Sequence, residues 1–239
     1  MFKRSYVKAL FLFVLLSLSL TVAPIFAQGS TELRYGISNN LDTLDPNVTT
    51  FSSVGVVMFH VFDTLVLQDP LGTYHPALAT SWEINDDATE YTFTLREDAT
   101  FHDGTPVNAE AVKFTFDRIA NPDTVSQLAI SLLGPYAESE VVDDYTITVR
   151  FSAPYAPFLN SLSTPYLGIA SPTAVETLGA DYGTTTIVGS GPFRLESYTP
   201  NSEVVLVRND DYAWGSEAVF GQSGPAASER LVFSIIAEP

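Results

Sequence analysis

The stretch FHDGTPVNAEAVKFTFDR, residues 101–118, joins a His-Asp pair to a turn and an amphipathic run. As chemistry, His102-Asp103 would begin a metal site or an acid/base site. As structure, residues 103–106 form a turn that leads into a helix, because Asp, Gly and Pro each favour a turn position. A metal-dependent hydrolase needs further His and Asp ligands. The chain has only 3 His and no second His-Asp pair, so we interpret the stretch as the entrance to a helix.

The residues after the turn predict where this helix begins and ends. Asn108 is a favourable N-cap, and the charge of Glu110 suits the first turn. Asn121-Pro122 ends the helix, because a residue before proline avoids the helical region. The predicted buried face consists of Ala111, Val112, Phe114, Thr115 and Ile119.

Two β-hairpins flank this helix in the sequence. Residues 82–96 (WEINDDATEYTFTLR) and 139–150 (SEVVDDYTITVR) both give a strand, an Asp-Asp turn and a strand. Period-two alternation predicts antiparallel strands with one face in solvent. The side chains predicted to face the core are Tyr91, Phe93, Leu95, Tyr145, Ile147 and Val149.

The remaining segments mix strands and helices. We expect strands over 31–38, 64–67 and 229–239, loops over 39–47 and 69–73, a helix from Ser52 or Ser53 to about Phe62, short helices over 157–163 and 172–178, and a hairpin over 188–210. Strand pairs grouped in this way indicate an α/β or α+β architecture.

Composition limits the class of protein. A length of 239 residues favours one large domain or two small ones. The absence of Cys excludes a disulfide framework, a Cys-based zinc site, a cysteine nucleophile and a thioether-linked lipid anchor. A net charge of −17 disfavours nucleic acid and anionic membranes as partners.

Residues 1–27 have the pattern of a secretory signal peptide. Lys3, Arg4 and Lys8 precede an apolar run over 9–22, and Ile25-Phe26-Ala27 resembles a cleavage site. The alternative is an uncleaved membrane anchor, since the apolar run is nearly long enough to span a bilayer.

No motif assigns a catalytic residue. Residues 189–193 (GSGPF) lack the Gly-x-Ser-x-Gly spacing of a nucleophile elbow and precede a strand, so we expect a bend where the backbone approaches another segment. The carboxylate pairs at 86–87, 143–144 and 210–211 fall in predicted turns, whereas a glycosidase needs two carboxylates across a cleft.

Taken together, the segments resemble one family. LDTLDPN (41–47), FDTLV (62–66), residues 75–122, GSGPFRLESYTPNSEVVLVRNDDYAWG (189–215) and RLVFSII (230–236) follow one another as in the peptide/nickel-type extracellular solute-binding proteins that serve ABC importers. The resemblance covers nearly all of the chain from Leu33 to Pro239. It implies an exported binding protein without catalytic residues, cofactor or metal site.

The resemblance also implies a type II-like periplasmic binding protein fold, with two lobes around a cleft. Residues 28–239 would form the N-terminal lobe, with 31–54 and 186–239 as its main part and 55–185 as an inserted subdomain. Family members are roughly twice as long, as expected when a chain splits into two lobes. We therefore expect an N-terminal fragment whose second lobe is missing.

The positions that match cleft-lining segments of the family are Asn40, Thr50, Phe51, Ser52, Gln127 and Leu128. Relatives often carry an aromatic residue near Leu128, so this chain departs from the pattern there. The implied ligand is a peptide, with an oligosaccharide or a nickel complex as alternatives, and the implied partner is an ABC permease. We expect a soluble protein in the periplasm or outside the cell. A secreted hydrolase with a carboxylate pair and a non-transport sensor or interaction module remain alternative functions.

Overall fold

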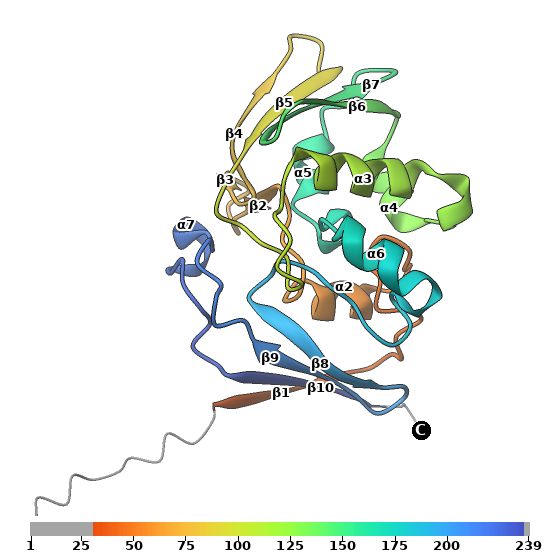
Figure 1. The fold of residues 1–239 in the computed structure, drawn as a ribbon, viewed down its shortest axis with the longest axis vertical. Coiled ribbons are helices and arrows are strands. Elements are labelled where there is room, and N and C mark those ends of the chain that lie inside the picture. The colour runs from red at the N-terminus through yellow and green to blue at the C-terminus, as the bar shows by residue number, and fades with distance from the viewer. Residues whose placement is uncertain (1–30, 237–239) are drawn as a thin grey trace, which may run out of the picture.

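A computed structural model describes residues 31–236 of the chain. Within this range the strands form two four-stranded sheets and one two-stranded sheet. Figure 1 shows the two larger sheets at opposite ends of the molecule, with most of the helices between them. The predicted signal peptide over 1–27 lies outside the described residues. No helix within 31–236 is long and apolar enough to cross a bilayer.

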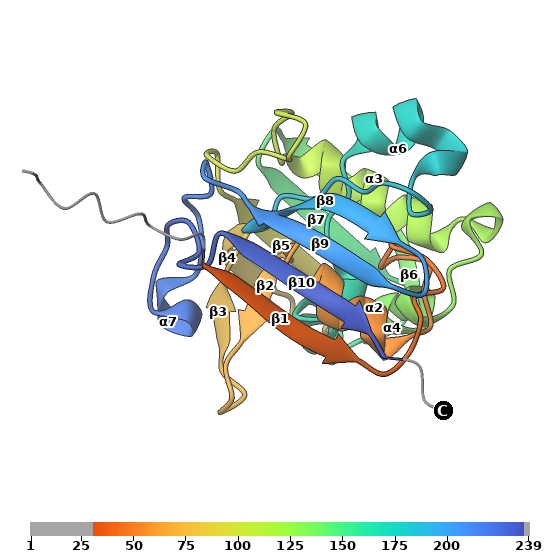
Figure 2. The same ribbon diagram turned by 90° about the horizontal axis from the view of Figure 1, so that it is seen from below.

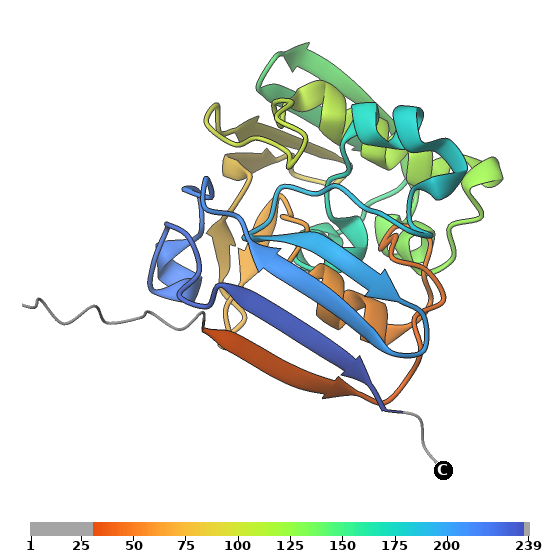
Figure 3. The ribbon, with the colours of Figure 1, turned by 60° about the horizontal axis from the view of Figure 1, so that its bottom comes forward.

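The first sheet joins the two ends of the described chain. Its order is β1 (Glu32–Ile37), β10 (Arg230–Ile235), β9 (Glu203–Arg208) and β8 (Phe193–Thr199). β1 and β10 are parallel, and the other neighbours are antiparallel. Figures 2 and 3 show these four strands side by side, with the helices behind them. Within the described residues, the predicted strands at both ends and the hairpin before β10 are confirmed; residues 237–239 of the last predicted strand lie outside them.

The second sheet contains both predicted hairpins. Its order is β4 (Ala79–Ile84), β5 (Glu90–Leu95), β7 (Thr146–Phe151) and β6 (Tyr136–Asp143), and every neighbouring pair is antiparallel. The core-facing side chains are buried as expected, except that Tyr145 is only partly buried. The opposite face is not wholly in solvent, because Thr148 is buried and its hydroxyl lies 2.9 Å from that of Thr92.

The central helix α3 (Ala109–Ala120) confirms the reading of the opening stretch as a helix entrance. The Asn108 side chain accepts a hydrogen bond from the backbone N–H of Ala111 at 3.0 Å, and the helix ends before Asn121. The predicted buried face was wrong at one position, because Phe116 rather than Phe114 is buried. Phe116 stands four residues after Val112, where helical periodicity returns a side chain to the same face.

The helix α2 (Ser52–Met58) is shorter than predicted. It ends before Phe59, and residues 59–61 continue as turns in which the backbone carbonyls of His60 and Val61 accept hydrogen bonds from segment 191–193. Gly191 donates its N–H to the Val61 carbonyl oxygen at 2.9 Å. A Cβ atom at Gly189 would lie 2.1 Å from the same oxygen, which confirms the expected close backbone approach at the GSGPF bend.

The remaining elements connect the sheets. They are β2 (Val66–Gln68), β3 (Tyr74–Pro76), α4 (Leu128–Leu133), α5 (Phe158–Leu162), α6 (Pro172–Leu178), α7 (Glu217–Phe220), and the 3-10 turns η1 (Pro122–Thr124), η2 (Pro165–Leu167) and η3 (Gly179–Asp181). The two short helices predicted from proline and glycine positions are α5 and α6.

The apolar side chains form two buried clusters. One lies between the second sheet and helices α3 and α5, and includes Phe93, Phe116 and Phe158. The other lies under the first sheet, and includes Val57 of α2 and Phe233 of β10. These clusters fix α2 and α3 against different sheets, and the loops between them carry the candidate site.

Candidate ligand-binding surface

Hydrogen bonds from its own side chains hold the loop between β1 and α2 together. The Asp42 carboxylate accepts hydrogen bonds from the Thr49 hydroxyl at 2.6 Å and from the Thr50 N–H at 3.4 Å. The Thr49 hydroxyl in turn accepts the N–H of Phe51 at 3.0 Å. These short-range bonds hold residues 50–52 in one place at the start of α2.

A buried ion pair anchors this loop to α3. Arg118 Nη2 lies 2.5 Å from Asp45 Oδ2, and the two side chains are only 16% and 4% exposed. Beside them, the Asn47 side chain donates to the Tyr166 carbonyl oxygen at 2.9 Å. The Arg118 guanidinium also stands 5.4 Å from the centre of the Tyr182 ring. The loop is therefore fixed to the rest of the protein through polar groups that are largely buried.

A second segment reaches the same loop from the end of α3. Ser126 donates its hydroxyl to the Asn47 carbonyl oxygen at 2.6 Å, which places Gln127 and Leu128 beside the loop. Val125 has a φ of 56° and is 65% exposed. A β-branched residue is strained in this left-handed region, so the surrounding bonds hold the segment in a conformation that its sequence does not favour.

We call Thr50, Phe51, Ser52, Gln127 and Leu128 the candidate surface. Leu128 is partly buried, and the other four residues are exposed, Phe51 by 44%. The structure thus brings two of the predicted cleft segments to neighbouring positions. Asn40 is also exposed, but its side chain accepts a hydrogen bond from the N–H of Asn201, in the β8–β9 turn, at 3.3 Å. Within residues 31–236, no hydrogen bond joins it to the candidate surface.

The chemistry of the candidate surface is neutral. Its members offer an aromatic ring, an aliphatic side chain, two hydroxyls and an amide, and none carries a charge. The nearby carboxylates of Asp42 and Asp45 already accept hydrogen bonds from the loop and from Arg118. Such a surface can contact a solute by stacking and hydrogen bonding, but it cannot neutralise a charged group.

Sequence reasoning missed the residues that hold the candidate surface in place. Asn47 and Ser126 did not stand out, because each is an ordinary loop residue until the fold brings the two together. Tyr166 was also missed. It packs closely against Gly55, because a Cβ atom at position 55 would lie 2.6 Å from the Tyr166 hydroxyl. Only the Asp-Pro step at 45–46 marked the loop as a defined turn.

The His102-Asp103 pair is part of the scaffold. The Asp103 carboxylate accepts hydrogen bonds from the Thr105 N–H at 2.9 Å and from Ser171 at 2.5 Å, and Ser171 caps α6. His102 Nε2 lies 3.0 Å from the carbonyl oxygen of Gly191. Burial lowers the pKa of His102 to about 4, so the ring is neutral near pH 7. Within residues 31–236, no three His, Asp or Glu side chains are grouped to hold a metal ion.

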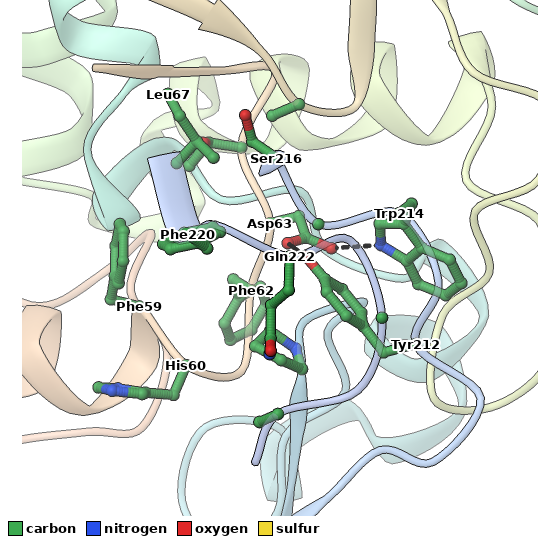
Figure 4. Close-up of a pocket in the computed structure, with 16 residues that line it drawn as sticks. Phe59, His60, Phe62, Asp63, Leu67, Tyr212, Trp214, Ser216, Phe220 and Gln222 are labelled. Carbon is green, nitrogen blue, oxygen red and sulfur yellow. Dashed lines mark hydrogen bonds between the residues drawn. The ribbon is translucent and has the colours of Figure 1, made fainter. Parts of the chain in front are cut away.

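A separate pocket of about 240 Å³ lies at the other end of α2. Asp63 is at its wall. Its carboxylate accepts hydrogen bonds from Trp214 Nε1 at 2.7 Å and the Tyr212 hydroxyl at 3.0 Å (Figure 4), and from the Ser190 hydroxyl at 3.0 Å. Desolvation raises the pKa of Asp63 to about 6. Sequence reasoning did not assign this site, although a carboxylate inside the apolar run VFDTLVL is a signal of a buried charge.

The chain is similar to known solute-binding proteins. The profile of bacterial extracellular solute-binding proteins, family 5 Middle, matches residues 73–239. The probable D,D-dipeptide-binding periplasmic protein DdpA of Escherichia coli K12 is 34% identical over 216 residues, which are 84% of this chain and 41% of DdpA. The glutathione-binding protein GsiB of Salmonella typhi is 32% identical over 197 residues, 82% of this chain and 38% of GsiB.

The fold agrees with solved structures of the same kind. The dipeptide binding protein of Pseudoalteromonas sp. SM9913, in complex with Met-Leu, superposes with a TM-score of 0.75 at 25% identity, over 87% of this chain and 43% of that one. The chain thus spans about two fifths of the length of the curated relatives it matches. It belongs to the bacterial extracellular solute-binding proteins of family 5, and its fold is part of the mixed α/β fold of periplasmic binding proteins.

Proposed function

We propose that the protein is the exported substrate-binding component of an ABC importer and that residues 28–239 form its first lobe. On this proposal, 31–54 with 186–239 form the main part of the lobe, and 55–185 form the inserted subdomain. The solute lies in a cleft between this lobe and a second one, and the lobes close by a hinge motion before the protein docks on a membrane permease. Family membership supports the proposal, as do the periplasmic relatives.

The observation that carries the proposal is the exposed, neutral candidate surface on a rigidly held loop. Binding sites place exposed side chains on loops that a rigid scaffold positions. Here the scaffold is the buried Asp45–Arg118 pair together with the bond from Ser126 to Asn47. An exposed ring such as Phe51 on so firmly anchored a loop is suited to contact a solute.

We propose a peptide as the solute, with an oligosaccharide or a nickel complex as the alternatives. Relatives are named for a D,D-dipeptide and for glutathione, and a similar structure holds Met-Leu. Because the candidate surface is uncharged, it would contact the peptide backbone and side chains. The charged ends of the peptide would be held by groups on the facing lobe.

Calorimetric titration tests the proposal. The intact protein, meaning both lobes of the proposed cleft, is titrated with Met-Leu, glutathione, a neutral oligosaccharide and a nickel complex. The first lobe alone, residues 28–239, is titrated in parallel. We expect saturable binding of a peptide by the intact protein and little or none by the lobe alone, because closure of both lobes desolvates the ligand. Micromolar binding by the lobe alone would contradict the two-lobe cleft.

The location and the partner are part of the same proposal. We propose that the protein is released into the periplasm or the extracellular space, and cell fractionation tests this. A non-transport sensor on the same fold would bind the solute without binding a permease, so co-purification with membrane components separates these two functions. The hydrolase alternative predicts turnover of the bound ligand, whereas the relatives named above are binding proteins.

A further inference from the structure

The pocket beside Asp63 lies apart from the candidate surface. It is lined by the residues that follow α2, by Leu67 of β2, and by the segment over 212–226 that contains α7. The candidate surface, in contrast, begins at the N-terminal end of α2. Figure 4 shows the Asp63 carboxylate turned toward Tyr212 and Trp214, with Phe59, Phe62 and Phe220 among the other residues that line the pocket.

Asp63 has hydrogen bonds but no cationic partner. Its three donors, Ser190, Tyr212 and Trp214, are all uncharged. Arg96 is the nearby cation, and its guanidinium is occupied: it bonds both oxygens of Asp98, at 2.6 and 2.9 Å, and the Trp214 carbonyl oxygen at 2.7 Å. Among residues 31–236, no Lys or Arg therefore donates to the Asp63 carboxylate.

The carboxylate also retains room for a further donor. Oδ2 accepts from both Ser190 and Trp214, whereas Oδ1 accepts only from Tyr212. A carboxylate oxygen can accept two hydrogen bonds, so Oδ1 has one position left. Asp63 is one of the residues that line the pocket. A donor bound inside the pocket would use this remaining position.

The walls of the pocket favour a particular kind of donor. They carry the rings of Phe59, Phe62 and Phe220, and the faces of aromatic rings attract organic cations. The volume of about 240 Å³ is below the range of about 300–1,000 Å³ of typical ligand pockets. A cavity of about 150 Å³ already holds benzene, so there is space for one ring and a small polar group.

We propose that this pocket binds a small organic cation, an ammonium group on an apolar or aromatic body. The ammonium donates to Asp63 Oδ1, and the body packs against Phe59, Phe62 and Phe220. Phe220 is half-exposed on the short helix α7, which places it where a ligand would enter. The inference concerns a second site and does not rest on the proposed transport function.

The test compares two probes that differ in charge. Benzylammonium and benzyl alcohol share a ring and a methylene group, and each is titrated into the intact protein at mildly alkaline pH, with binding followed by calorimetry and ligand-observed NMR. We expect benzylammonium to bind roughly tenfold or more tightly than benzyl alcohol, the factor that one hydrogen bond to a charged group supplies. Equal binding of both probes, or binding of neither, overturns the proposal.

Variants locate the binding. Asp63→Asn is expected to remove the preference for benzylammonium. Phe220→Leu retains apolar volume but removes a ring, and is expected to weaken benzylammonium by roughly two- to fivefold and benzyl alcohol by less. Phe220→Leu leaves all hydrogen bonds to Asp63 intact, so it serves as the test if Asp63→Asn does not fold.

Phe51→Ala, at the other end of α2, should leave benzylammonium affinity unchanged. A loss of affinity in Phe51→Ala but not in Phe220→Leu overturns the proposal.

Discussion

Arg118 and Asp45 form an ion pair between parts of the chain 73 residues apart, with Nη2 2.5 Å from Oδ2. One partner belongs to the central helix α3, and the other to the loop that leads to the candidate surface. The pair is almost fully enclosed, and Asp45 Oδ1 accepts the N–H of Asn47 at 2.9 Å as well. The position of the loop therefore depends on a largely buried ion pair.

Asp45→Ala should destabilise the protein by about 3–5 kcal/mol, because it leaves the Arg118 guanidinium buried without its partner. Urea unfolding measures the change. The matched control is Asp210→Ala, which removes the acidic partner of Arg208. The Asp210 side chain is 75% exposed. We expect about 0–1 kcal/mol there. Equal losses in the two variants would mean that the enclosure of the pair is unimportant.

Val125→Asn should stabilise the protein by about 1 kcal/mol. Asn tolerates a positive φ, whereas a β-branched residue is strained there. Val142→Asn is the control, because Val142 is also exposed but has no positive φ and lies in a strand, where Asn is unfavourable. Thermal unfolding should therefore shift upwards in the first variant and downwards in the second. A downward shift in Val125→Asn would show that the valine side chain makes a compensating contact.

Asp63 should make the folded state less stable as the pH rises from about 4 to about 6. Its pKa is raised from 3.8 to about 6 by desolvation, so the folded protein retains the proton that the unfolded chain releases. The full effect is about 3 kcal/mol. We would measure urea unfolding of wild type and Asp63→Asn across this range and take the difference, since other carboxylates titrate in both. A difference that does not change with pH would show that Asp63 has an ordinary pKa.

His102 should change the stability of the folded state with pH in the opposite direction to Asp63. Burial lowers its pKa from 6.5 to about 4, so the folded state resists protonation and stability is lost as the pH falls from about 6.5 to about 4. NMR of the histidine rings should show that His102 titrates near pH 4. His102→Gln provides the assignment and removes the signal. Titration of His102 near 6.5 would mean that its ring is open to water.

Phe51→Ala should weaken binding of the proposed peptide solute by roughly two- to tenfold, the range expected from loss of one aromatic contact. Calorimetry with the intact protein measures the change. Leu71→Ala is the control, because Leu71 is an exposed apolar side chain in the turn between β2 and β3, away from the candidate surface. Unchanged affinity in Phe51→Ala would place the solute elsewhere.

Local sequence patterns predicted most of the secondary structure. The cap at Asn108 and the two Asp-Asp hairpins depend on residues only a few positions apart, so their patterns are readable without the fold. The end of α2 was misplaced because His60 and Val61 bind the distant segment 191–193 through backbone groups, and no local pattern reports that contact.

The candidate surface was less predictable. Its members came from the resemblance to a family, and the residues that hold them in place, Asn47, Ser126 and Arg118, became visible only in three dimensions. The bond from Ser126 to Asn47 spans 79 residues. Each of these residue types is common in loops or on helix surfaces, so the sequence alone does not distinguish a buried partner from an exposed one.

The parallel pairing of β1 with β10 has a mechanical consequence. The two strands run in the same direction and are paired at six positions, from Glu32↔Arg230 to Ile37↔Ile235. Tension applied between Thr31 and Ile236 would load this ladder along its length, so that its hydrogen bonds share the force instead of opening one after another. The strand that begins the described chain and the strand that ends it thus act together as a clamp against stretching.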